Sequence, residues 1–157
     1  AESVNVIGHS MGCRCIIGAI ETLKVKGEPV RKLINKVILA AADVDVGSMK
    51  YLGPKAISLS SGITSYVSDK DKALKLSSWL HDFDRVGLAP PTFILDGIDT
   101  VHVNDDNLGS FSHGYIGSSR TVLGDVFSIL KDGANPEDRF GLECVVDHSG
   151  RYWRIKV

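Results

Sequence analysis

Residues 4–12 read VNVIGHSMG, in which a short apolar run leads into the pattern Gly-x-Ser-x-Gly and then into a segment with helical periodicity. This order of strand, serine turn and helix is typical of a nucleophile elbow. Such a tight turn leaves room only for residues without bulk beside the serine, which predicts a steric need for Gly8 and Gly12. The helix that follows directs free N–H groups toward Ser10, and the Met11 N–H is the expected first donor to an oxyanion formed there. The stretch therefore predicts an acyl-transfer site at Ser10.

The composition of the 157 residues, 43% hydrophobic and 24% charged, is typical of a single globular domain with a substantial core. The 18 basic and 19 acidic side chains nearly balance, so the net charge of -1 gives no electrostatic reason to expect binding to nucleic acid or to a membrane surface. No apolar run approaches the ~20 residues that a transmembrane helix needs. The sequence leaves the cellular compartment open.

The three cysteines, Cys13, Cys15 and Cys144, do not form a disulfide framework by their number or spacing. An odd number cannot all pair within one chain, and the first two lie two positions apart on an expected helix, where they face different sides. We therefore expect buried free thiols and no metal cluster made of cysteines.

Beyond the elbow, strand and helix signals alternate along the chain. Further strands are expected at residues 37–42, at 63–68 and at 98–103, with residues 93–95 as a competing candidate for the last strand. Helices are expected after the elbow, over residues 51–59 and 71–80, and between a polar loop at 104–117 and Gly133. This alternation predicts an α/β fold with a parallel sheet and crossover helices, whose functional residues lie at the carboxyl ends of the strands.

A serine nucleophile needs a histidine to accept its proton and a carboxylate to orient that histidine. In elbow-type enzymes the chain order is serine, acid, histidine, so the histidine is expected late in the chain. Of the five histidines, only His113 lies in a loop between the last core strand and the last helix. The other four lie in the elbow, at a helix end, in strand-like sequence and in the tail: His9, His81, His102 and His148. We therefore expect His113 to act as the general base.

Three aspartates compete for the role of the acid. Asp71 follows the third strand and precedes a helix, Asp43 follows the second strand, and Asp69 lies two residues before Asp71. Aspartate is also a common helix N-cap, so Asp71 has a purely structural interpretation as well. The residues alone leave the three candidates open.

Five stretches of the chain together resemble a known family. They read VNVIGHSMG, KVILAAADVD, SYVSDKDKAL, SFSHGYIGSSRTVLGDVF and RYWR. In these stretches the chain resembles bacterial α/β hydrolases of the esterase/lipase superfamily, and more narrowly a subgroup catalogued as a domain of unknown function. The resemblance implies that Ser10 is the nucleophile, that Asp71 rather than Asp43 is the acid, and that His113 is the base. It also implies a partial α/β-hydrolase fold that runs from the nucleophile-elbow strand onward.

The amino end of the chain departs from the α/β-hydrolase pattern. That fold normally has several strands before its elbow, and a loop among them supplies the second oxyanion N–H, yet here the elbow begins at residue 8. We therefore expect the carboxyl half of a longer hydrolase domain, with residues 1–135 in its body and residues 136–157 in a tail that forms a β-hairpin. The first strand is then expected to have an open apolar edge, where the missing amino-terminal half docks or a second copy associates.

These observations predict a serine hydrolase that acts on small carboxylic esters or related acyl compounds and is catalytically incomplete as this fragment. The chemistry requires no cofactor and no metal. A metal site made of His102, Asp105, Asp106 and His113 is conceivable by residue type, but the spacing matches no firm ligand pattern. The alternative from another class is a non-catalytic binding or scaffolding module that keeps the fold and has lost turnover.

Overall fold

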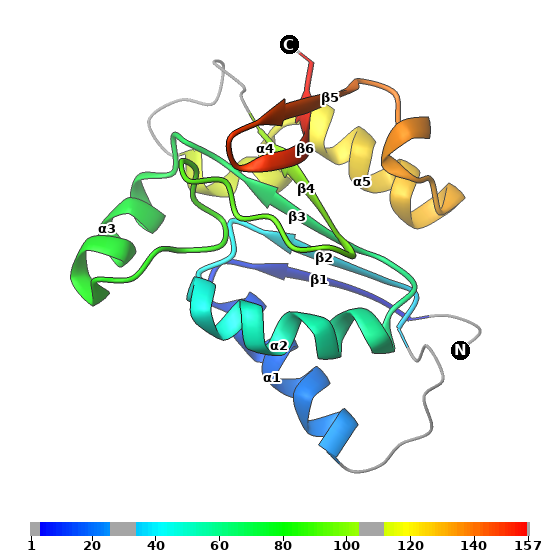
Figure 1. Ribbon diagram of the computed structural model, residues 1–157. Helices are drawn as coiled ribbons and strands as arrows, with labels where there is room; N and C mark the ends of the chain where they lie inside the picture. Colours follow the sequence, from blue (N-terminus) through cyan, green and yellow to red (C-terminus); the bar gives the residue numbers. More distant parts are fainter. Residues whose placement is uncertain (1–3, 26–33, 104–111, 157) are drawn as a thin grey trace.

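The computed structural model describes residues 4–25, 34–103 and 112–156, and its strands form a six-stranded sheet in the order β1-β2-β3-β4-β6-β5 (Figure 1). The strands are β1 (Asn5–His9), β2 (Lys36–Ala40), β3 (Ile63–Val67), β4 (Ile98–His102), β5 (Leu142–Asp147) and β6 (Gly150–Ile155). β1 to β4 are parallel neighbours in chain order, which confirms the predicted parallel sheet.

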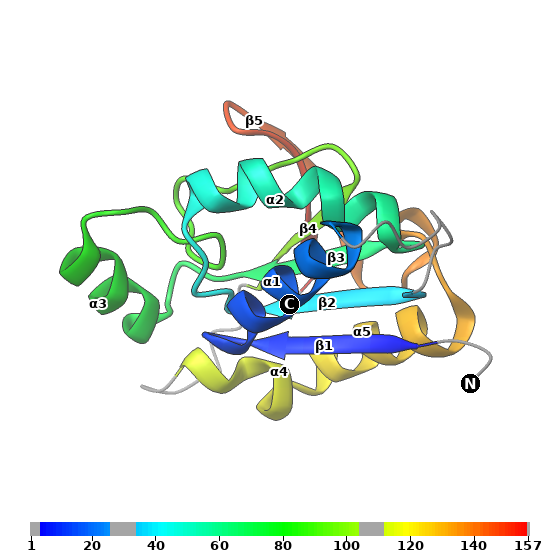
Figure 2. The same ribbon diagram turned by 90° about the horizontal axis from the view of Figure 1, so that it is seen from below.

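Helices cover both faces of this sheet. They are α1 (Gly12–Val25), α2 (Val46–Leu59), α3 (Lys72–His81), α4 (Tyr115–Ser118) and α5 (Arg120–Asp132), with short 3-10 turns η1 (Ser112–Gly114) and η2 (Pro136–Asp138). α1 and α2 lie on one face and α4 and α5 on the other (Figure 2), whereas α3 projects beyond the carboxyl ends of the strands (Figure 1). None of the helices within the described ranges has the length and apolar character needed to cross a bilayer.

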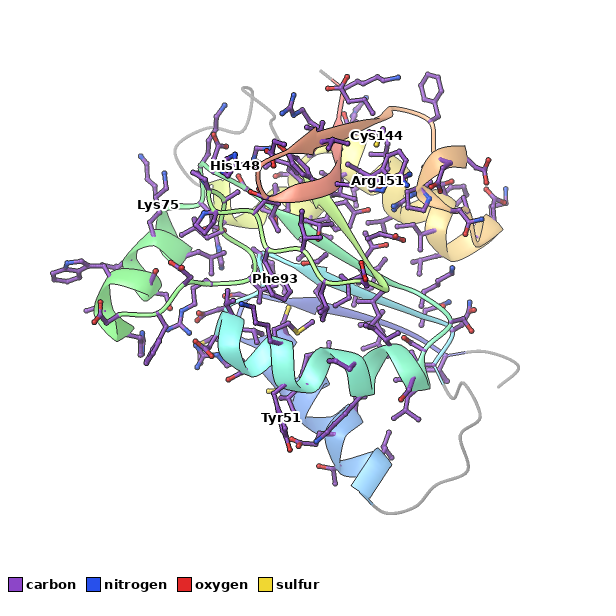
Figure 3. The ribbon with its side chains drawn as sticks, in the orientation of Figure 1. Tyr51, Lys75, Phe93, Cys144, His148 and Arg151 are labelled. Atoms are coloured by element: carbon purple, nitrogen blue, oxygen red, sulfur yellow. The ribbon has the colours of Figure 1, made fainter. Side chains whose placement is uncertain are left out.

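The central strands owe their continuous apolar sequence to burial on both faces. Along β2, Val37 and Leu39 pack into the core under α1 and α2, while Ile38 packs into the opposite core with α5. Phe93 belongs to the first of these cores and lies between the sheet and α2 (Figure 3). The sheet is therefore the middle layer of three.

β1 differs from the central strands because one of its edges is free. It ends the order of strands and, within the described residues, pairs with β2 alone. Ile7 stands opposite Ile38 in the register, yet its side chain is 49% exposed. Parallel strands are normally covered, so this exposed apolar edge matches the edge expected from the sequence.

The carboxyl-terminal residues form the predicted hairpin, and the hairpin extends the central sheet. β5 and β6 pair in antiparallel fashion around His148 and Ser149, and β6 also pairs in parallel with β4 through Val101 and Trp153. Of the two candidates for the fourth strand, residues 98–102 join the sheet. Residues 93–95 do not form a strand, and the Phe93 carbonyl accepts a hydrogen bond from Thr100 at 2.9 Å.

Two predicted boundaries were wrong. The helix expected over residues 51–59 begins at Val46, because Asp45 caps it by accepting the Ser48 N–H at 2.7 Å. Pro54 consequently lies inside α2 rather than near its start. The polar loop expected to continue to residue 117 ends earlier, because η1 and α4 occupy residues 112–118; residues 104–111 of that loop lie outside the described residues.

Candidate active site

The turn that carries Ser10 has the backbone of an elbow. Ser10 has a φ of 51°, a left-handed conformation that residues other than glycine rarely adopt. Its N–H donates to the Ala40 carbonyl at 3.0 Å, and its own carbonyl accepts the N–H groups of Cys13 and Asp43 at 3.1 and 3.2 Å. These bonds tie the strained turn to the end of β2 and to the first turn of α1.

The two glycines of the elbow serve different purposes. A Cβ at Gly8 would lie 2.6 Å from Ile16 Cδ1 and 3.1 Å from Cys13 Sγ, so a side chain there would collide with α1. At Gly12, by contrast, nothing in the described part of the chain lies within 4 Å of an added Cβ. The steric reason predicted for Gly12 is therefore wrong, while that for Gly8 is confirmed.

The residue after the serine offers a free backbone donor. Met11 precedes the first residue of α1 and its side chain is 63% exposed. Among the described residues, the Met11 N–H has no hydrogen-bond acceptor. A free N–H at the start of a 14-residue helix also lies at the positive end of the helix dipole. Met11 can therefore donate to a developing negative charge beside Ser10.

Asp71 and His113 are joined by a short hydrogen bond. His113 Nδ1 lies 2.7 Å from Asp71 Oδ2, and the Asp71 side chain is fully buried. The other oxygen, Oδ1, accepts the Leu74 N–H at 2.9 Å and so caps α3. The cap fixes the carboxylate, and the carboxylate in turn holds the Nδ1 proton of the ring and leaves Nε2 as an acceptor. Asp71 can therefore cap α3 and pair with His113 at the same time.

His113 lies against the elbow through His9, the residue before Ser10. His9 Nε2 donates to the His113 carbonyl at 2.8 Å, and the two rings are 4.7 Å apart between centroids. Within the described residues, no hydrogen bond joins the Ser10 hydroxyl to His113. The structure therefore brings the histidine to the acid and to the neighbour of the serine, and leaves the link between serine and histidine unmade.

Asp43 faces a different set of partners. Its Oδ1 lies 3.1 Å from an Arg14 terminal nitrogen and 3.2 Å from Arg85 Nε, and it also accepts the Ser77 hydroxyl at 2.9 Å. Arg14 Nε donates to the Asp43 backbone carbonyl as well. The carboxylate that competed with Asp71 thus links α1, α3 and the segment before residue 90, and His113 is not among its partners in the described chain.

Asp69, the third candidate for the acid, lies beside His102 at the end of β4. Asp69 Oδ1 is 3.7 Å from His102 Nε2, and burial lowers the pKa of His102 below its usual value. Of the metal site considered above, Asp105 and Asp106 fall outside the described residues. Within the described residues, no group of three metal-ligating side chains comes together.

Tyr115 is a residue that the sequence interpretation missed. It is completely buried two positions after His113, its hydroxyl donates to the Tyr66 carbonyl, and it accepts the Ala41 N–H, both at 2.8 Å. Burial raises the pKa of Tyr115 above its usual value. Ala41 has a φ of 46°, so the hydroxyl also supports a second strained turn beside the elbow. An aromatic residue two positions after a candidate histidine was the signal available for this anchor.

Comparison with known proteins places these residues in a family. The sequence model of a family described as alpha/beta hydrolase of unknown function (DUF900) matches residues 1–123, a range that contains Ser10, Asp71 and His113. No curated protein and no solved structure matches the chain. Because the family model covers well over half of the 157 residues, the chain belongs to this family of α/β hydrolases of unknown function.

Proposed function

We propose that this domain belongs to a serine hydrolase that cleaves carboxylic esters or related acyl compounds. Ser10 Oγ attacks the acyl carbonyl carbon while its proton passes to His113 Nε2, and the Met11 N–H stabilises the oxyanion of the tetrahedral intermediate. The intermediate collapses to an acyl-serine, and His113 returns the proton to the departing alcohol. Water then attacks the acyl-serine with the same histidine as base, which releases the acid and restores Ser10.

The observation that carries this proposal is the His113–Asp71 pair beside a strained serine turn. A histidine held by a buried carboxylate through Nδ1 presents Nε2 as the base, which is the arrangement that serine activation needs. The backbone of Ser10 stays in a costly conformation of about 1–3 kcal/mol, and strain of this kind is concentrated at functional sites. The open contact between Ser10 and His113 is compatible with this role, since catalytic hydrogen bonds are often long before substrate binds.

A second candidate is a binding or scaffolding module without turnover. The absent hydrogen bond between Ser10 and His113 within the described residues is the observation that favours it. The two proposals differ in one respect that can be measured, which is whether the protein turns over an ester through Ser10.

The test is hydrolysis of 4-nitrophenyl butyrate by the full-length protein and by its Ser10→Ala variant. We expect Ser10→Ala to lose at least about 10³-fold in kcat while its circular dichroism stays unchanged, since a hydroxyl at the surface of a turn adds little packing. The matched control is Ser61→Ala, which changes an exposed serine away from the elbow. Equal turnover by Ser10→Ala and the unaltered protein would contradict the serine mechanism, and the absence of turnover in both would favour the module.

A further inference from the structure

Large apolar side chains are exposed along α3 and just after its end. They are Leu76, Trp79, Leu80 and Phe83, and each is between 56% and 76% exposed. The first three lie at the spacing i, i+3, i+4, so they share one face of the helix. α3 projects beyond the carboxyl ends of the strands, the end of the sheet that also carries the elbow (Figure 1). We call these four residues the α3 apolar face.

The opposite side of α3 is held by specific contacts. Leu74 is buried in the core, and the Ser77 hydroxyl donates to Asp43 Oδ1 at 2.9 Å. The Ser78 hydroxyl donates to the Phe83 carbonyl, also at 2.9 Å, which ties the residues after the helix to its last turn. These contacts fix the rotation of α3 about its own axis. The α3 apolar face is therefore held outward by the fold.

Lysines border the α3 apolar face at the start of the helix. Lys72 and Lys75 are exposed and precede two of the apolar side chains by one helical turn. Figure 3 shows the Lys75 side chain extending outward from α3. A lysine stem can lie along apolar surface while its ammonium group reaches a phosphate. Asp82 and Asp84 follow the helix and balance this charge, so burial of apolar side chains must supply most of any binding, with the lysines orienting the helix.

The size and shape of the α3 apolar face favour a lipid surface over a second copy of the chain. Its side chains present roughly 500 Å² in total, since an aromatic side chain alone has about 150–250 Å². A standard interface between two proteins buries about 800 Å² on each partner. A projecting helix also needs an apolar hollow in such a partner, yet half of the residues that line the largest cavity of the described chain, about 840 Å³, are charged. A lipid surface deforms around a helix and accommodates tryptophan and lysine at its headgroups.

We propose that the α3 apolar face docks on a phospholipid surface, with its four side chains inserted at the level of the headgroups and the two lysines against lipid phosphates. Asp71 connects this surface to the candidate active site, because it caps α3 through Oδ1 and holds His113 through Oδ2. A lipid surface at α3 therefore lies near the carboxylate that positions the histidine. The inference goes beyond the proposed hydrolysis and does not depend on it, because docking is measured without turnover.

The experiment is flotation of the full-length protein with vesicles made of phosphatidylcholine and phosphatidylglycerol in equal parts. We expect Trp79→Ser combined with Leu80→Ser to lower the lipid partition coefficient by at least about tenfold, because less apolar area then leaves water. The matched control is Phe127→Ser, which removes an exposed apolar side chain of α5 and should leave the partition coefficient unchanged. Circular dichroism checks that each variant is folded.

Two further measurements locate the contact. Vesicles should shift the emission of Trp79 to shorter wavelength, so Trp79→Phe should keep the binding and lose this part of the shift. Lys72→Gln combined with Lys75→Gln should lower the partition coefficient by about tenfold on the mixed vesicles and little on phosphatidylcholine alone. An emission shift that Trp79→Phe leaves unchanged would contradict insertion at α3.

The outcomes separate docking from the reaction. Flotation that the double serine variant loses and Phe127→Ser keeps would support the inference, whereas no flotation at millimolar lipid would overturn it. If the double serine variant instead shifts sedimentation toward the monomer without lipid, the face contacts a second copy and the inference is wrong. Ser10→Ala should float as the unaltered protein does. If the protein floats but hydrolyses no ester, the proposed function fails while the docking surface stands.

Discussion

At the scale of single residues, Asp71 explains how one carboxylate can serve both the fold and the site. Oδ1 caps α3 at Leu74 and Oδ2 holds His113, so the fold positions the acid before any substrate arrives. The sequence predicted each role separately but could not say that both occur together. Which aspartate faces His113 depends on contacts between residues 42 positions apart, and these follow from the tertiary arrangement alone.

The two roles of Asp71 can be separated by substitution. Asparagine is also a good N-cap, so Asp71→Asn should keep α3 capped and still lower kcat by about 10³–10⁴-fold, because the histidine is no longer oriented as a base. Asp71→Ala should lose the same activity and a further ~1 kcal/mol of unfolding free energy through the lost cap. Ester kinetics and urea unfolding measure the two effects. Equal activity of Asp71→Asn and the unaltered protein would contradict the assignment of the acid.

Cys13 offers a prediction about reactivity and pH. It lies buried behind the elbow, whereas Cys15 and Cys144 are exposed, so the burial expected for all three thiols was wrong for these two. Burial raises the pKa of the Cys13 thiol to about 12 from an ordinary value of 9.0. The folded protein should therefore alkylate with iodoacetamide at pH 8 at the exposed Cys15 and Cys144, and only slowly at Cys13. The unfolded thiol loses its proton first, so the stability contribution is complete below pH 9 and is lost as the pH rises toward 12. Peptide mass mapping checks the rates, and equal labelling of all three thiols would contradict the burial of Cys13.

At the scale of elements, the spacing of apolar residues and the positions of glycine and proline predicted most helices and strands. Long-range contacts decided the rest. Gly133 ends α5 in a left-handed conformation, as its position after the apolar face suggested. The parallel pairing of β6 with β4 places Val101 beside Trp153, which lies far along the chain. Nothing in the local sequence of either strand specifies this pairing. α4 was missed because four residues are too few to show a helical period, and its main support is the hydroxyl of Tyr115.

The role of α4 can be tested at Tyr115. Tyr115→Phe removes the hydroxyl that bridges the Tyr66 carbonyl and the Ala41 N–H, leaving both buried groups without this partner. Because the Ala41 N–H also donates to the Tyr66 carbonyl at 3.3 Å, we expect a loss of about 1 kcal/mol in unfolding free energy, together with a lower kcat because His113 is two residues away. Tyr51→Phe is the matched control, since Tyr51 projects from α2 on the outer side of the molecule (Figure 3) and should change stability by less than about 0.5 kcal/mol. Similar losses in both variants would contradict the anchoring role.

At the scale of the whole molecule, the sheet has two unlike ends. β5 ends it on one side as half of a hairpin, and β1 ends it on the other with the apolar Ile7 exposed. We propose that the exposed β1 edge pairs with a second copy of the chain.

Sedimentation velocity of the 157-residue chain tests the free edge. We expect dimers or larger species, and Ile7→Lys should shift the distribution toward the monomer because a charge on an edge strand opposes pairing. Val146→Lys on β5 is the matched control, since Val146 is exposed on the opposite end of the sheet and should leave the association unchanged. A chain that sediments as a monomer would contradict the proposal.

The most direct test of the central claim is the labelling of the full-length protein with a fluorophosphonate probe, followed by mass spectrometry of the modified peptide. A serine activated by His113 should carry the label at Ser10, and His113→Ala should slow the labelling by at least about 10²-fold. His81→Ala is the control, because His81 bonds within α3 to the Ser77 carbonyl and should leave the rate unchanged. If Ser10 in the folded protein stays unlabelled, or if His113→Ala is labelled as fast as the unaltered protein, the account of Ser10, His113 and Asp71 as a catalytic unit is wrong.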